Sequence, residues 1–180
     1  AFGPGPGWHV GQGAILAIFS VFAFLAEDLG RFLVHMLAHR IPPLWELHKV
    51  HHSAAVLTPF TVYRTHPIES IIMRSGAALG VGVVAGVMSF CFGGPISGWA
   101  IVGVDAIGLV WNALGANLRH SGVWLSYGRV LEHVFISPAQ HQIHHSDRRE
   151  HFHTNFGSSP AHLRPRHDQR RHRHTDRPSQ

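Results

Sequence analysis

Two short segments of the chain contain three histidines each, with the same spacing. HKVHH covers His48 to His52, and HQIHH covers His141 to His145, 93 residues further along. In both segments the histidines stand at positions i, i+3 and i+4, which puts three rings on one side of an α-helix. Neutral imidazole is a ligand for iron, zinc, copper and nickel. The chemistry that this pattern predicts is therefore metal binding.

Two further segments that contain histidine extend the pattern. HMLAH carries His35 and His39 at i and i+4, and NLRH ends at His120. One zinc ion takes about four protein ligands, so nine imidazoles are enough for two ions with open positions left over. We predict that nine histidines bind metal, and these are His35, His39, His48, His51, His52, His120, His141, His144 and His145.

The ligand type alone leaves the metal open, but it narrows the class of site. HExxH, the signature of zinc metalloproteases with a glutamate base, does not occur. The spacing Glu-x-x-His of the soluble di-iron carboxylate bundles occurs only at Glu150 and His153, outside the histidine clusters. The remaining interpretation is an all-nitrogen site for two ions.

Ligating histidines usually donate their other ring N–H to a carboxylate or a carbonyl. Asp28 lies on the helical stripe that leads through Arg31 to His35 and His39. We expect Asp28 to hold one of these rings. His151 is close enough to the third cluster in sequence to support it in the same way.

Three apolar stretches must position these clusters. They cover about residues 13–34, 71–92 and 98–118, and the last two are separated by the turn GGPIS. Stretches of about 20 apolar residues are long enough to span a bilayer. We predict an all-α integral membrane bundle, with 71–92 and 98–118 forming a helical hairpin.

The basic residues predict the orientation of this bundle. Arg40, Lys49 and Arg64 lie between the first and second spans, whereas residues 1–26 and the GGPIS turn carry no lysine or arginine. Basic residues collect on the cytoplasmic side. Because two further spans return the chain to that side, we expect a multi-pass protein with a histidine-rich helical cap facing the cytoplasm.

The net charge of +5 does not indicate nucleic-acid binding. Residues 1–146 hold seven Lys+Arg against six Asp+Glu, and residues 147–180 hold eight against four. We expect residues 1–157 to form the membrane domain and residues 158–180 to be a disordered or aberrant basic tail. The chain starts at Ala1 without an initiator Met, as in a fragment or a processed form, and its one cysteine, Cys91, excludes an internal disulfide.

The histidine pattern closely resembles that of a known family. HMLAH, HKVHH, NLRHSG and SPAQHQIHHS, followed by NFG at Asn155 to Gly157, resemble the three histidine boxes of the fatty acid hydroxylase and sterol desaturase superfamily, over about residues 20–157. The resemblance implies a non-haem di-iron oxygenase that uses O2 to hydroxylate or desaturate a lipid C–H bond. It also implies an electron donor such as a cytochrome b5 or ferredoxin system, and the nine histidines named above as ligands.

Two departures and one further position accompany the resemblance. His66, in RTHP, also matches a family position, which implies a supporting residue or a possible ligand. Many relatives have histidine where this chain has Gly122, and after NFG they continue into an apolar segment that is missing here. Two other functions stay open: a histidine-rich membrane metal transporter, which the position of the clusters outside the spans disfavours, and a zinc-dependent membrane hydrolase.

Overall fold

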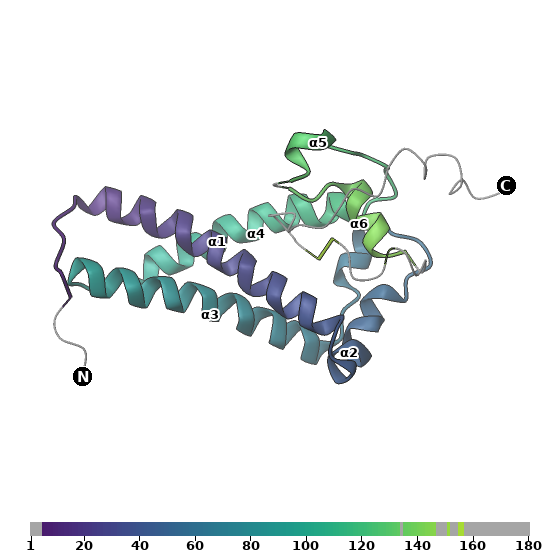
Figure 1. Cartoon of the computed structure of the whole chain (residues 1–180), viewed down its shortest axis with the longest axis horizontal. Coiled ribbons are helices and arrows are strands. Elements are labelled where there is room, and N and C mark those ends of the chain that lie inside the picture. Colours follow the sequence, from purple (N-terminus) through teal and green to yellow (C-terminus); the bar gives the residue numbers. More distant parts are fainter. Residues whose placement is uncertain (1–4, 134, 147–150, 152–154, 157–180) are drawn as a thin grey trace.

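The computed structural model describes residues 5–133, 135–146, 151 and 155–156, and the statements below concern this part of the chain. It contains six α-helices, one 3-10 helix and no strand, so the expected all-α fold is confirmed (Figure 1). In chain order they are α1 (Gln12–Ala38), α2 (Pro42–His52), η1 (Pro59–Tyr63), α3 (Pro67–Phe92), α4 (Gly98–Arg119), α5 (Gly128–Leu131) and α6 (Pro138–His144).

Three of these helices, α1, α3 and α4, are long and apolar enough to cross a membrane. They correspond to the three expected spans, but α3 begins at Pro67 instead of near residue 71. His66 caps its first turn, since its Nδ1 accepts from the backbone N–H of Ile68. Proline is well suited to the first position of a helix, because its missing N–H would have no partner there. At the other end α3 stops at Gly93, whose φ of 71° suits glycine.

The helix pair α1 and α3 packs through small residues. A side chain added to Gly80 would bring its Cβ to 2.2 Å from the backbone oxygen of Ala26, and one added to Gly30 would reach the oxygen of Gly76 at the same distance. Ala26 and Gly30, like Gly76 and Gly80, are four residues apart. This is the small-xxx-small pattern with which membrane helices approach closely.

All three long helices share a core near the turn between α3 and α4. Phe19 and Ala23 of α1 are fully buried there against Met88 of α3 and Val104 of α4. Elsewhere α3 and α4 expose large apolar side chains, such as Leu79 at 70% and Leu114 at 72%. Surfaces of this kind suit lipid as their surroundings.

The short helices lie at the other end of the bundle. Figure 1 shows α2 and α6 at the same end of the bundle as the C-terminal ends of α1 and α4. Two prolines, Pro42 and Pro43, open α2. A capping box opens α6, in which Ser137 accepts from the backbone of Gln140 and Gln140 accepts from the backbone of Ser137. Local sequence signals therefore set where the helices carrying HKVHH and HQIHH begin.

The close approach of α1 and α3 can be tested with two glycines of the same helix. Gly80→Ala should lower the free energy of unfolding in detergent by about 1–3 kcal/mol, because the new Cβ meets the backbone of α1, which cannot yield without separating the helices. Gly82→Ala is the control, since nothing lies within 4 Å of its added Cβ. Equal stability of the two variants in a denaturant titration would contradict this packing.

Candidate metal centre

The nine predicted ligands all lie at one end of the molecule. His35 is on the last turns of α1, and His39 and His120 are the residues that end α1 and α4. His48, His51 and His52 lie on α2, and His141, His144 and His145 lie on or directly after α6. Histidines from α1, α2, α4 and α6, or from the residues that directly follow these helices, therefore lie together.

The ring nitrogens gather into two groups. In each group, one nitrogen from every member lies within 4.8 Å of all the others. The first group is His35, His39, His48, His52 and His144, and the second group is His51, His120, His141 and His145. Opposite ligands at a metal–nitrogen bond length of about 2.1 Å are about 4.2 Å apart, so each group has the size of a shell around one ion.

Each HxxHH segment contributes two rings to one group and one ring to the other, and the two segments do so in opposite order. His48 and His52 join the first group, and His51 joins the second. His141 and His145 join the second group, whereas the middle histidine of that segment, His144, joins the first. The groups are therefore adjacent, and the rings of His52 and His145 stack across the boundary with centroids 4.3 Å apart.

The described contacts include three rings whose orientation is fixed by a bond at Nδ1. His120 Nδ1 donates to the carbonyl of Ala116 at 2.9 Å, and His35 Nδ1 donates to the carbonyl of Phe156 at 2.8 Å. His48 Nδ1 lies 2.5 Å from Oε1 of Glu69. A neutral ring that donates from Nδ1 has a bare lone pair at Nε2. These three lone pairs point into the groups, as ligation requires.

Hydrogen bonds cannot account for the contacts inside the second group. The Nε2 atoms of His51, His120, His141 and His145 form a chain in which each successive pair is 3.1 Å apart. A neutral ring nitrogen either donates or accepts, and His120 Nε2 carries no hydrogen. At most two of the three contacts can then be hydrogen bonds. A cation between the rings removes the conflict, and nitrogens bound at right angles at about 2.1 Å would lie about 3.0 Å apart.

The surroundings keep these rings neutral. Burial, helped by the charges that His120 and His48 would carry, lowers the pKa of His51 from its ordinary value of 6.5 to about 3. Burial likewise lowers the pKa of His120 to about 4. The pKa of His145 is lowered by burial and then by the neighbouring imidazoles, with His52 the largest of these. Neutral imidazole is the form that binds metal, so the residues present fit a metal centre.

The three residues expected to support the ligands lie outside both groups. Asp28 is buried on α1. It precedes His35 by seven residues, about 10 Å along the helix axis, which is too far for a contact between the side chains. His66 caps α3, and His151 is buried without joining either group.

Sequence reasoning missed residues that contact the rings. Glu69 meets His48. The ring of Trp45 lies 5.3 Å from that of His39, and the ring of Phe156 lies 5.0 Å from it. Trp45 stands three residues before His48, so helical spacing could have placed it beside this segment. Glu69 follows the RTHP motif, but its partner lies on a different helix.

Comparison with known proteins adds an independent finding. The family model described as fatty acid hydroxylase matches residues 20–163. An ornithine lipid hydroxylase of Rhizobium tropici is 28% identical over 141 residues, which are 77% of this chain and 38% of that protein. An alkylglycerol monooxygenase of Homo sapiens is 27% identical over 127 residues, which are 71% of this chain and 25% of that protein. The chain thus spans well under half the length of these relatives. No solved structure matches it significantly.

The lowered pKa values predict how stability depends on pH in the metal-stripped protein. The unfolded chain binds protons at its histidines below about pH 6.5, whereas folded His51 and His120 stay neutral down to about pH 3–4. Each such ring should therefore cost about 1.4 kcal/mol of stability per pH unit below 6.5. We expect unfolding in detergent to become easier from pH 7.5 to 5.5. The double variant H51A/H120A should show a smaller change, and an equal change would contradict the assignment.

Proposed function

The chain belongs to the fatty acid hydroxylase family, and on that basis we propose that it is a membrane-bound di-iron oxygenase that oxidises a lipid C–H bond. The observation that carries the proposal is the pair of adjacent all-imidazole groups at the end of three apolar helices. Five rings would hold one iron and four would hold the other. Imidazole suits iron, and two ions with incomplete shells leave positions for O2.

The bound irons would supply the reduction of O2 and the oxidation of an unactivated carbon. The overall reaction that we propose is R–H with O2, two electrons and two protons giving R–OH and water. The residues of the chain contribute neutral nitrogen donors on several helices, with the rings of His35, His48 and His120 held by bonds at Nδ1. Ligands fixed in this way need little rearrangement when metal binds.

We propose hydroxylation ahead of desaturation. The two relatives described above are named a hydroxylase and a monooxygenase, and both names refer to lipids with a polar head. A lipid of this kind would place its chain along the apolar faces of α3 and α4, and its head at the level of the histidine groups. The electrons would come from a partner such as a cytochrome b5 or ferredoxin system.

The domain boundaries and the orientation are also proposals. We propose that residues 1–157 form the membrane oxygenase domain; the tail of residues 158–180 lies outside the described residues. The histidine end would face the cytoplasm, because Arg40, Lys49 and Arg64 are at that end and the turn after α3 has no basic residue. Arg40 and Arg64 are exposed, as this placement requires.

Two rival functions are less well supported. A transporter that passes metal through the membrane needs ligands along its spans near the midplane, whereas the described histidine groups gather around the ends of α1 and α4. A zinc-dependent hydrolase needs a base beside its metal-bound water. Glu69, a carboxylate of the described part of the chain that contacts a ring of these groups, lies on the far side of His48, at Nδ1.

Metal and activity measurements test the oxygenase proposal. Protein purified in detergent should contain about two irons per chain and oxidise lipid only with O2 and reductant present. His144→Ala should abolish this activity and lower the iron content, because it removes a buried member of the first group. His9→Ala is the control, since His9 is exposed and lies before α1. Zinc without lipid oxidation would instead support the hydrolase.

Labelling of single cysteines tests the orientation. In a Cys91→Ala background, Glu46→Cys on α2 and Gly94→Cys in the turn after α3 place a thiol at either end of the bundle. A membrane-impermeant maleimide added to right-side-out vesicles should label position 94 and leave position 46 unlabelled until the membrane is opened. The reverse pattern would place the histidine groups outside the cytoplasm.

A further inference from the structure

Glu69 is a buried acid in contact with the histidine groups. It is 5% exposed, and its Oε1 lies 2.5 Å from Nδ1 of His48. Its other oxygen, Oε2, is buried and has no hydrogen-bond partner among the described residues. Buried carboxylates usually have both oxygens hydrogen-bonded, because removing them from water is costly. Glu69, with its one described hydrogen bond to His48, therefore differs from the usual buried carboxylate.

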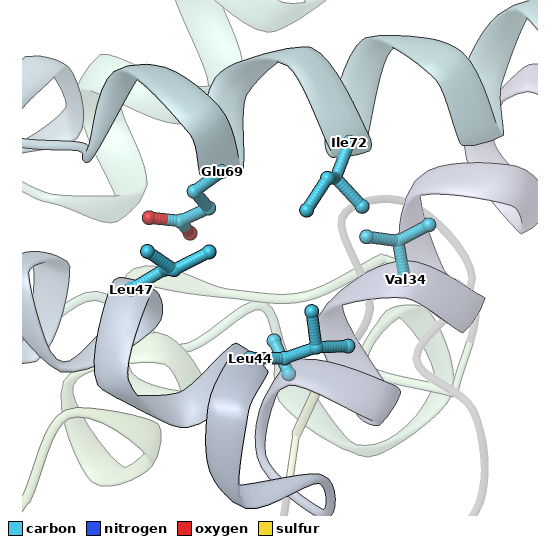
Figure 2. Close-up of a pocket in the computed structure, with 6 residues that line it drawn as sticks. Val34, Leu44, Leu47, Glu69 and Ile72 are labelled. Atoms are coloured by element: carbon cyan, nitrogen blue, oxygen red, sulfur yellow. The ribbon is translucent and has the colours of Figure 1, made fainter.

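On one side Glu69 borders a small cavity whose other lining residues are apolar. Figure 2 shows the side chain leaving α3 and pointing toward Leu47 of α2, beside a cavity of about 10 Å³. A cavity of this size has room for at most about one water molecule. Its lining consists of Val34, Ala38, Leu44, Leu47, Glu69 and Ile72. No basic residue lines this cavity. The described partner of Glu69 is the imidazole of His48, which is not one of the lining residues.

Glu69 lies at the N-terminal end of α3. His66 caps the helix and Pro67 is its first residue, so Glu69 lies in the first turn. The positive end of the helix dipole stabilises a carboxylate at that place. The sequence HPIE thus begins α3, and its glutamate, Glu69, contacts His48 of α2 from the first turn of the helix.

We propose that Glu69 is a positioning residue for the metal ion of the first group. By accepting the Nδ1 hydrogen of His48, it keeps the lone pair on Nε2, which lies 3.0 Å from Nε2 of His39 and 3.1 Å from Nε2 of His52. The carboxylate also makes the ring a stronger donor to a cation. This inference rests on the proposed metal centre and adds to it a residue that acts through His48 without touching the metal.

Release of iron to a chelator tests this role in the purified full chain. The wild type should release its two ions slowly. In Glu69→Gln one ion should leave about 10-fold faster and the other at the wild-type rate, because glutamine keeps an oxygen acceptor but loses the charge. In Glu69→Ala the same ion should leave up to about 100-fold faster. Mössbauer spectra should show a change at one of the two iron sites.

A matched control is Glu27→Gln, which alters another buried acid, one that is paired with Arg31 of its own helix. It should release both ions at the wild-type rate. If Glu69→Ala does not fold, Glu69→Gln decides, since glutamine has the same shape. Wild-type kinetics in Glu69→Gln, or equal acceleration of both ions, would overturn the positioning role alone. A wild type that takes up no metal would overturn the proposed function as well.

Discussion

The mutual approach of imidazole nitrogens is the constraint on which the rest of the structure depends. Along the chain from His51 through His120 and His141 to His145, neutral rings stand 3.1 Å apart with too few hydrogens to bond every pair. Burial keeps protons off these rings, so charge on the rings themselves offers no relief. A cation between the nitrogens would make the arrangement favourable, and metal binding would then stabilise the folded end of the bundle.

The membrane helices make this arrangement achievable. The close contact of Gly30 with Gly76 lies one to two turns from His35, so the approach of α1 and α3 sets the distance between the first histidine pair and the start of α3. The same approach brings Glu69 to the level of α2, where it meets His48. The glycines that let α1 and α3 approach therefore also help to place the histidines beyond the apolar part of the helices. A shift of one of these helices would move ligands of the first group.

The sequence was sufficient for some features and insufficient for others, for physical reasons. Long apolar runs predicted α1, α3 and α4, because composition alone decides whether a helix can span a bilayer. Helical spacing showed which histidines share a face. It could not assign neighbours such as His51 and His52 to different groups, because that division depends on how the helices are placed around the rings. The contact of Glu69 with His48 was not predicted for the same reason, because the two residues are 21 positions apart and lie on different helices.

The opposite sharing of the two HxxHH segments has a consequence for how the two ions would communicate. Because His51 and His52 are adjacent on α2 yet belong to different groups, a small rotation of α2 would change both sets of nitrogens together. The same holds for His144 and His145 at the end of α6. A segment that contributes one histidine, such as the end of α4 with His120, would in contrast affect only one group. Two ions bound in the proposed way would therefore both respond to a movement of α2 or α6.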